Sequence, residues 1–291
     1  MKIIAATHVH NAQRWVGYAI ASLINSVDLV LIGISRQTTD RTKDIIDLFV
    51  DKFPDKIKTY ENDRCDLVEG GFGAVKTDMI KRCGKLGADW ILNFDHDHIY
   101  YPMGYDRLHK LAEDKSRLNL NAVKFRQYFI YNGLRTLPLD PAINPKVNNL
   151  GYSMFASFFK YTDKVCCKGV VHETVKEVGA WSFNPEFDFA HIGPVMSDWE
   201  VVEKELFYAK LNRKMENEED EVAWLKKCQE IKFFPTCMLD FTARRRLEFP
   251  LGLPDISEVK EGGLPPVLKT YINGYHALDI EHLIKFIKEG K

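Results

Sequence analysis

The first hundred residues alternate between short apolar runs and stretches with helical spacing of apolar residues. DLVLIGI at Asp28–Ile34 is continuously apolar, which is typical of a strand buried on both faces. Strands alternating with helices predict a parallel α/β sheet with right-handed crossovers. The predicted strands are Lys2–Ala6, Asp28–Ile34, Lys56–Tyr60 and Trp90–Phe94. Three helices are predicted between them. The first carries Trp15, Ala19 and Leu23, the second carries Ile45, Ile46, Phe49 and Val50, and the third covers Val75–Leu86.

The pattern changes after Pro102. A helix is expected over Tyr105–Lys115, followed by a strand over Ala122–Tyr131 and a β-rich run over Tyr152–Tyr161. From Asp198 onward the chain is charged and helical in pattern, and the last predicted element is an amphipathic helix over Asp279–Lys288. The chain therefore combines an α/β sheet with a helical C-terminal extension.

Polar side chains follow several of the predicted strands. The loop after the second strand, Ser35–Asp40, supplies Thr39 or Asp40 as a helix N-cap, and the fourth strand ends at the tetrad Asp95-His96-Asp97-His98. Functional groups in parallel sheets gather beyond the carboxyl ends of the strands, so both segments are candidate site residues. Gly70–Gly73 lacks the spacing of a dinucleotide fingerprint and is expected to be a flexible loop.

The tetrad offers carboxylate oxygens suited to Mg²⁺ or Mn²⁺, because a turn can aim Asp95 and Asp97 at the same point. The alternative is an Asp-rich turn exposed to solvent. Later in the chain, His172 and Glu173 in VVHETV and His191 in DFAHIGP each follow a short apolar run. A single histidine is usually a hydrogen-bonded structural residue, but these lie at predicted element ends, and Glu173 could act as a general base.

Composition and charge restrict the class of protein. The chain has 291 residues, is 45% hydrophobic and 28% charged, and carries a formal net charge of −1, so strong non-specific attraction to nucleic acid or membranes is not indicated. Its first residues lack the continuous apolar block of a signal peptide or membrane span. Its six cysteines include no C-x-x-C pair, which favours small buried side chains in a reduced compartment, and we expect a soluble cytoplasmic protein.

Several weak motifs, in order, resemble family 2 glycosyltransferases with the GT-A fold, especially the bacterial and viral subgroup with an iHE motif. Val9-His10-Asn11 is similar to V-x-N-E with Ala12 in place of Glu, and ISRQTTDRT resembles D-x-x-S-x-D-x-T with Ser35 in place of the first Asp. Lys76 and the following ADWILNFDHDH resemble a basic residue before G-D-W-I-L-x-L-D-A-D-E, with His98 in place of an acid. KGVVHETV and HIGP resemble the later G-x-x-H-E and H-x-G segments.

The resemblance implies a GT-A domain over residues 1–212, with a central mostly parallel mixed sheet flanked by helices, and a helical extension over 213–291. It implies a metal-dependent enzyme that transfers a sugar from a nucleotide-diphosphate donor. Asp97, Asp95 and His191 would hold Mn²⁺ or Mg²⁺, while His96 and His98 would border the site. Glu173 would be the general base of an inverting displacement, with His172 orienting it or the acceptor. The residues expected to bind the donor are Thr7, Ser35, Asp40, Lys76 and Asp95.

Two other functions remain open at this point. The density of His and Asp at 95–98, together with His172 and His191, would also suit a metal-dependent phosphoesterase. The replacements Ser35 and Ala12 would suit a catalytically inactive protein that only binds nucleotide sugars. The acceptor could be a saccharide, a protein or a modified nucleic acid; Arg244–Arg246 could contact phosphates, although such a run is more typical of a solvated or ion-paired helix face.

Overall fold

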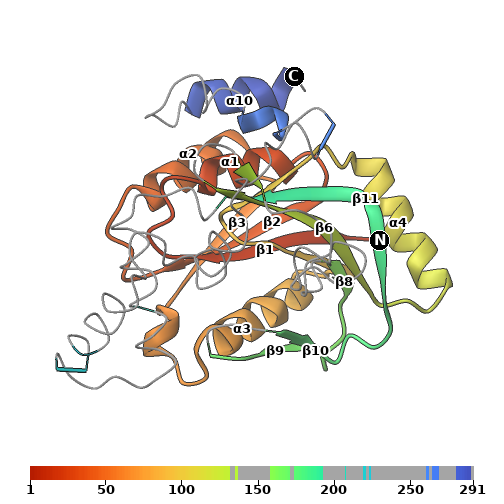
Figure 1. The fold of residues 1–291 in the computed structure, drawn as a ribbon, viewed down its shortest axis with the longest axis horizontal. Coiled ribbons are helices and arrows are strands. Elements are labelled where there is room, and N and C mark those ends of the chain that lie inside the picture. Colours follow the sequence, from red (N-terminus) through yellow and green to blue (C-terminus); the bar gives the residue numbers. More distant parts are fainter. Residues whose placement is uncertain are drawn as a thin grey trace, which may run out of the picture.

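The computed structural model describes residues 1–131, 135–136, 158–170, 174–192, 207, 219–220, 223, 260–261, 264–268 and 280–289. A single large sheet runs through this part of the chain in the order β3-β2-β1-β4-β8-β6-β11-β5 (Figure 1). Its first half is parallel: β1 pairs with β2 and β4, and β2 pairs with β3. The four strands predicted in the first hundred residues are confirmed as β1 (Ile3–Val9), β2 (Leu29–Ser35), β3 (Ile57–Asn62) and β4 (Trp90–Asn93).

The second half of the sheet is mixed. The short strand β8 (Phe158–Lys160) runs antiparallel to β4 and to β6 (Ala122–Tyr131), and β7 (Arg135–Thr136) pairs with the end of β6. The long strand β11 (Trp181–His191) is parallel to β6 and antiparallel to β5 (His98–Tyr100). The expected mixed, mostly parallel α/β sheet flanked by helices is therefore confirmed. The sequence did not predict β5, which begins inside the polar tetrad, or the full length of β11.

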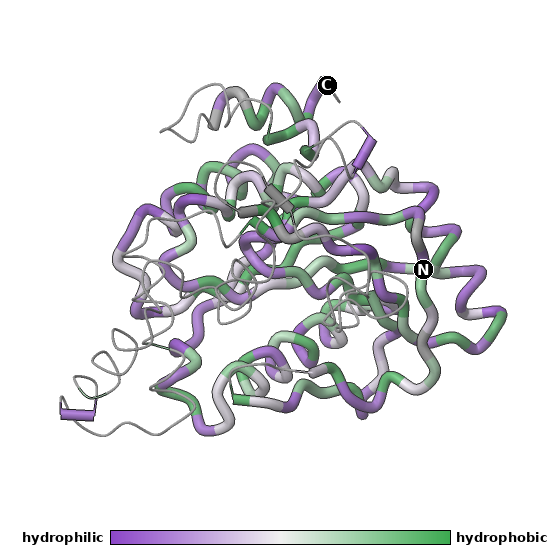
Figure 2. Tube along the Cα trace, in the orientation of Figure 1, coloured by the Kyte–Doolittle hydropathy of each residue, from purple (hydrophilic) through white to green (hydrophobic). Residues whose placement is uncertain are grey.

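Helices cover both faces of the sheet (Figure 1). On one face, α1 (Val16–Leu23), α2 (Thr42–Lys52), α4 (Tyr105–Arg117) and α10 (Ile280–Glu289) share one apolar core. On the other, α3 (Gly71–Lys85) shares a second core with the small sheet of β9 (Cys166–Lys168) and β10 (Thr174–Lys176). Along these helices hydrophobic and hydrophilic residues alternate (Figure 2), as one buried face requires.

Strand β1 shows why the central strands are apolar on both sides. Ile3 and Ala5 belong to one core, whereas Ile4 and Ala6 belong to the other. Successive strand residues point to opposite faces, and here each face is covered by helices. The apolar runs read from the sequence thus reflect burial of the sheet on both faces.

The described part of the C-terminal extension packs onto the sheet domain. Helix α10 confirms the last predicted helix, and its Leu283 and Ile287 are buried in the core that contains α1. The Asn25 side chain donates a hydrogen bond to the Ile287 carbonyl at 2.8 Å. The expected boundary at residues 212 and 213 lies outside the described residues.

The described cysteines are free thiols, and Cys65, Cys83 and Cys167 are buried, as expected, while Cys166 is half-buried. Cys228 and Cys237 lie outside the described residues. Among the helices that the structure describes, none has the length and apolar character needed to cross a membrane.

Candidate functional site

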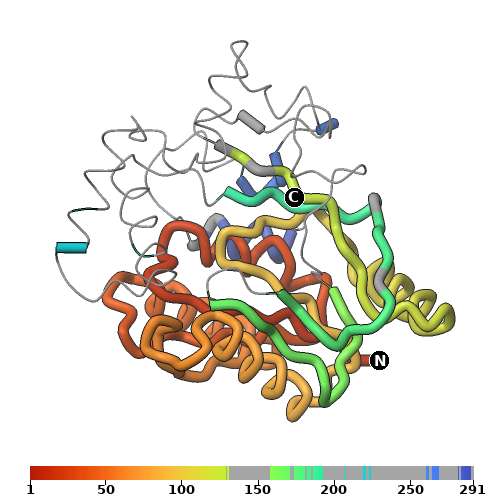
Figure 3. The backbone as a smooth tube through the Cα atoms, turned by 60° about the horizontal axis from the view of Figure 1, so that its bottom comes forward, coloured from red at the N-terminus to blue at the C-terminus, as the bar shows by residue number. Residues whose placement is uncertain are grey.

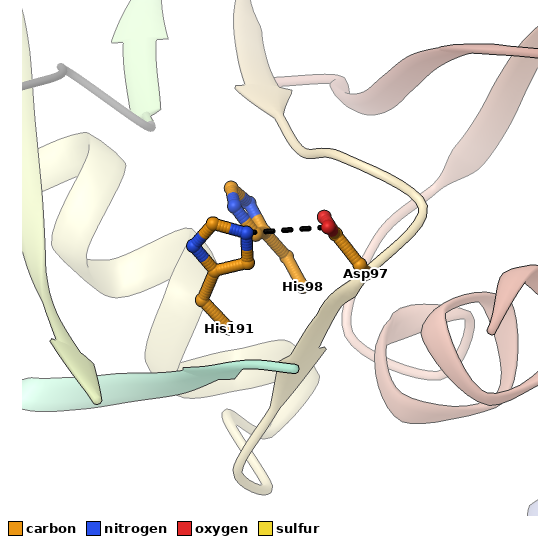
Figure 4. Close-up of side chains that lie close together, drawn as sticks. All are labelled: Asp97, His98 and His191. Carbon is orange, nitrogen blue, oxygen red and sulfur yellow. Dashed lines mark hydrogen bonds and ion pairs between the residues drawn. The ribbon is translucent and has the colours of Figure 1, made fainter. Parts of the chain in front are cut away.

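Asp97, His98 and His191 gather where the turn after β4 meets the end of β11 (Figure 4). Their ligand-capable atoms all lie within 4.8 Å of one another, and His191 Nε2 lies 3.2 Å from Asp97 Oδ2. The sheet produces this cluster, because His98 and His191 are direct register partners in the antiparallel β5–β11 pair. The Ile192 N–H also donates to the Asp97 carbonyl at 3.0 Å, which fixes the turn against β11.

Burial distinguishes this cluster from a solvated Asp-rich turn. The turn closes through a hydrogen bond from the His98 N–H to the Asp95 carbonyl at 3.0 Å, and Asp97 is only 5% exposed. A carboxylate removed from water needs compensating partners or a bound cation. One buried carboxylate with imidazoles beside it is a donor set that fits a divalent metal ion.

Asp95 lies outside this cluster, although the sequence suggested it as a metal ligand. Its Oδ1 accepts a hydrogen bond from Lys76 Nζ at 2.7 Å, and its side chain is 40% exposed. Partial removal from water would raise the pKa of Asp95, but the buried Lys76 ammonium and then His98 hold it well below its usual range. Asp95 is therefore an ionised carboxylate held by Lys76, and the structure brings His98 into the cluster in its place.

His98 is held by packing and by Asp95. Its Nδ1 accepts a hydrogen bond from the Asp95 N–H at 3.2 Å, and its Nε2 lies 3.6 Å from Asp95 Oδ2. The ring contacts Phe189 and His191 with centroids at 4.6 and 4.9 Å. Burial lowers the pKa of His98 to about 4, although Asp95 opposes the change. The imidazole is therefore neutral at pH 7, which is the form that binds a metal ion.

Gln127 is a site residue that sequence reasoning missed. It lies on β6, is 8% exposed, and its side-chain amide lies 2.8 Å from His191 Nδ1. The opposite ring nitrogen of His191 faces Asp97, so the ring lies between the amide and the carboxylate. The local sequence gave no signal, because Gln127 follows Arg126 in the predicted strand AVKFRQYFIY and its burial depends on the sheet.

Buried polar atoms without partners line the carboxyl edge of the first strands. The side-chain oxygens of Thr7, Thr38 and Asn93 have no hydrogen-bond partner within the described part of the chain. Thr7 is fully buried near the end of β1, and Asn93 is the last residue of the neighbouring strand β4. Because buried polar groups are nearly always satisfied, these atoms indicate a place for ordered water or a polar ligand.

Ser35 and Asp40 bond to the chain's own groups. Ser35, only 2% exposed, donates to Gln37 Oε1 at 3.0 Å, and Gln37 in turn donates to Asp63 Oδ1 at 3.3 Å. The sequence did not predict that Asp63 would bring a carboxylate close to Ser35. Asp40 accepts hydrogen bonds from Thr42 N–H at 3.0 Å and from Gln13 N–H at 3.1 Å. The expected N-cap at Thr39 or Asp40 is wrong, because α2 begins at Thr42 and its N-cap residue is Arg41. The Asp40 side chain instead connects the first helical residue to the loop after β1.

The expectation of a flexible glycine loop at Gly70–Gly73 is wrong, because Gly70 is the N-cap residue of α3 and the next three residues are the first of the helix. Phe72 and Gly73 donate their N–H groups to the carbonyls of Val170 and Gly169 at 3.1 and 2.9 Å. A Cβ on Gly73 would lie 2.8 Å from the Gly169 carbonyl oxygen, so the absent side chain permits this contact. Figure 3 shows the green segment that ends at Val170 beside α3. His172 and Glu173, the expected catalytic pair, lie just beyond it and outside the described residues.

No protein-family model matches the sequence, and no curated protein matches it. Among solved structures, residues 1–349 of S. aureus TarS have 13% identity and a TM-score of 0.42, covering 100% of this chain and 92% of that one. The mannosyltransferase PcManGT from Pyrobaculum calidifontis, solved with GDP-Man and Mn²⁺, has 11% identity and a TM-score of 0.41, covering 98% of this chain and 78% of that one. Such low similarity transfers no residue roles.

Proposed function

We propose that this protein is a metal-dependent glycosyltransferase of GT-A type that transfers a sugar from a nucleotide-diphosphate donor to an acceptor, with inversion. The observation that carries the proposal is the position of the polar groups in the sheet. β1 lies between β2 and β4, so the chain turns to opposite sides of β1 and creates a topological switch point at the β1–β4 edge. Ligands of open α/β sheets bind beyond the carboxyl ends of the strands at such a point.

The groups at this edge suit a nucleotide with a diphosphate. Thr7, Thr38 and Asn93 offer partnerless buried oxygens on the side of β1 and β2. The Lys76–Asp95 pair and the Asp97 cluster follow on the side of β4. We infer that the donor spans from the first group to the second, with Thr7, Ser35, Lys76 and Asp95 among its contacts. The hydrogen-bonded Asp40 supports this edge through α2 and the β1 loop.

Transfer would follow an inverting displacement. The acceptor oxygen forms a bond to the anomeric carbon, the bond from that carbon to the diphosphate oxygen breaks, and the electron pair leaves on the nucleoside diphosphate. Glu173 would take the acceptor's proton, with His172 orienting it. A bound metal ion would supply positive charge next to the leaving diphosphate. Asp97 and His191 would hold that ion, and Lys76 would add positive charge from α3.

The phosphoesterase alternative has less support. Phosphoesterases of the two-metal kind need ligands for a pair of ions about 4 Å apart. Within the residues that the structure describes, a single group of three side chains could hold a metal ion. The partnerless oxygens of Thr7 on β1 and of Thr38 in the loop after β2 belong to neighbouring strands, which favours a nucleotide site.

The test is release of nucleoside diphosphate. Purified full-length protein with Mn²⁺ should convert at least one of a panel of UDP-, GDP- and dTDP-sugars when saccharide and protein acceptors are present. Asp97→Asn should lower kcat by at least about 100-fold, because several kcal/mol of charge stabilisation are lost. Asp78→Asn, which changes a carboxylate on the outer side of α3, is the matched control and should keep full activity.

Calorimetry of donor binding, together with activity assays, separates the remaining alternatives. Donor binding without turnover across the whole panel would show a nucleotide-sugar-binding protein instead of an enzyme. Hydrolysis of simple phosphate esters that Asp97→Asn abolishes would support a phosphoesterase. If the Asp97→Asn variant turned over a nucleotide sugar as fast as the wild type, Asp97 would not be a ligand of a catalytic metal ion.

A further inference from the structure

We propose that the metal ion is held by two imidazoles and one carboxylate, from His98, His191 and Asp97, and is a first-row transition ion rather than Mg²⁺. This inference rests on the proposed function only for the presence of a metal at this site. It goes beyond that function by assigning His98 as a ligand and by selecting the class of ion. Asp95 lies beside the ligand His98 instead of binding the ion directly.

The donor set decides the class of ion. Mg²⁺ prefers six oxygen ligands and keeps several waters, whereas imidazole nitrogen favours transition ions. Here the ligand atoms within 4.8 Å of one another comprise one carboxylate and two imidazoles. For a mixed nitrogen and oxygen site, affinity rises from Mn²⁺ to Co²⁺. The cluster should therefore bind Co²⁺ more tightly than Mn²⁺, and Mg²⁺ much more weakly than either.

His191 has an outer partner that can prepare it as a ligand. A metal-bound histidine binds through one ring nitrogen and donates the N–H of the other to an acceptor. Nε2 of His191 faces Asp97, and its Nδ1 faces the amide of Gln127 at 2.8 Å. A side-chain amide carries both a donor and an acceptor, so rotation of its end lets Gln127 accept the Nδ1 proton. Gln127 is thus a positioning residue for His191.

His98 has the corresponding partner in Asp95. Its Nε2 lies 3.6 Å from the Asp95 carboxylate, and this carboxylate is held in place by Lys76 at 2.7 Å. A small approach of the ring would let Nε2 donate to this carboxylate and would leave Nδ1 as the ligand atom, which is the arrangement found around many metal-bound histidines. In this structure Nδ1 accepts only a long hydrogen bond, of 3.2 Å, from the Asp95 N–H, and metal binding would replace it.

The experiment is a metal titration of the chelator-treated full chain without any nucleotide. Calorimetry with Mg²⁺, Mn²⁺ and Co²⁺ should give one ion per chain, with Mg²⁺ at least about 100-fold weaker than Co²⁺. His98→Gln should weaken Co²⁺ binding at least about 10-fold and alter the visible absorption of the bound Co²⁺. His109→Gln, which changes a histidine on α4 that lies 3.2 Å from Asp28 and outside the cluster, is the matched control and should change neither.

A pair of variants at Gln127 tests the proposal independently, in case His98→Gln fails to fold. Gln127→Met removes the acceptor and should weaken Co²⁺ binding about 10-fold, while Gln127→Glu keeps an acceptor and should retain the affinity. Thermal unfolding of the metal-free variants shows whether any loss is simply a loss of fold. Equal affinity for Mg²⁺ and Co²⁺, or unchanged affinity and absorption in His98→Gln, would overturn the proposal.

A failure of this metal-site proposal can be told apart from a failure of the glycosyltransferase proposal. Selective Co²⁺ and Mn²⁺ binding that depends on His98, in a protein that turns over no nucleotide sugar, would support this inference and remove the glycosyltransferase proposal. Turnover of a nucleotide sugar that is fully supported by Mg²⁺ and insensitive to His98→Gln would support the glycosyltransferase and overturn this inference.

Discussion

Asp95 and Asp97 are separated by one residue, yet their surroundings differ. Asp97 is buried beside two imidazoles, whereas Asp95 is partly exposed and paired with the ammonium of Lys76. Adjacent turn residues point in different directions, so proximity along the chain does not make two carboxylates neighbours in space. At the residue scale, a D-x-D pattern indicated where a candidate metal site lies but could not predict which side chains meet there.

The Lys76–Asp95 pair should be measurably coupled. Lys76→Met leaves the Asp95 carboxylate without its cation and should lower the free energy of unfolding by about 1–3 kcal/mol. Asp95→Asn in the same background should recover part of that loss, because no charge then needs compensation. Urea unfolding of both single variants and the double variant should give a coupling of about 1–2 kcal/mol. Strictly additive effects would show that the pair contributes no net interaction.

His8 should make the protein sensitive to acid. Burial, followed by the Lys76 ammonium, lowers the pKa of His8 from 6.5 to about 4, so the folded protein carries it neutral. Between these values the unfolded chain binds the proton more readily than the folded protein does. Above about pH 6.5 His8 is neutral in both states and does not reduce the free energy of unfolding. As the pH falls from 6.5 toward 4, protonation of the unfolded chain lowers that free energy.

Replacing His8 with Asn should remove this dependence. Between pH 7 and pH 4.5 the wild type should lose about 2 kcal/mol more stability than His8→Asn. Urea unfolding of both proteins at the two pH values measures the difference. Parallel losses in the two proteins would contradict the lowered pKa of His8.

Helix α3 and strand β9 illustrate the element scale. Thr77 Oγ1 lies 2.7 Å from the Gly73 carbonyl and 3.1 Å from the Cys167 carbonyl, and it accepts from the Cys167 N–H at 2.9 Å. Together with the close contact at Gly73, these bonds fix the segment that precedes His172 and Glu173. The glycines and Thr77 therefore position the strand β9 against α3.

A matched pair at Thr77 tests this docking. Thr77→Val keeps the shape but leaves the Cys167 N–H without its acceptor, which should cost about 1–3 kcal/mol of stability. Thr77→Ser keeps the hydroxyl and should cost less than about 1 kcal/mol. If the docked strand carries the general base into place, Thr77→Val should also lower kcat more than Thr77→Ser does. A larger loss of stability in Thr77→Ser than in Thr77→Val would show that the methyl group, not the hydroxyl, matters.

The sequence predicted those helices and strands whose own residues carry a repeating apolar pattern. Strands β1 to β4 and helices α1 to α4 were predicted because burial imposes a repeating apolar pattern on each. β5 was not predicted, because its three residues begin with the polar His98 and its pairing depends on β11, far along the chain. For the same reason His98 and Gln127 could not be assigned to the site from local sequence, since only the sheet brings them to His191.

At the scale of the whole molecule, the C-terminal helix completes the core on one face of the sheet. Leu283 is 1% exposed, and α10 packs against α1. A separate contact ties the C-terminal part to β11, where Lys260 Nζ lies 2.5 Å from the buried Asp188 carboxylate. The described part of the extension is therefore integrated with the sheet.

Removing that packing should destabilise the domain. Leu283→Ala should lower the free energy of unfolding by about 2–4 kcal/mol, because a cavity remains between α10 and α1. Lys285→Ala on the outer side of the same helix, where the side chain is 67% exposed, should change stability by less than about 0.5 kcal/mol. Thermal or urea unfolding compares the two. Equal and small effects would mean that α10 contributes no cooperative stability.

The register pair His98↔His191 joins positions that are far apart along the chain, and Asp97 and His191 are 94 positions apart. Because these ligands meet only when β5 has paired with β11, the unfolded chain has no equivalent binding site. Any ion bound there stabilises the native state by mass action, by about 2.7 kcal/mol at a free concentration 100 times Kd. Loss of the ion would therefore loosen the β5–β11 pairing at the same time as it removed the charge proposed to act in sugar transfer, and limited proteolysis with and without a chelator would measure the first effect.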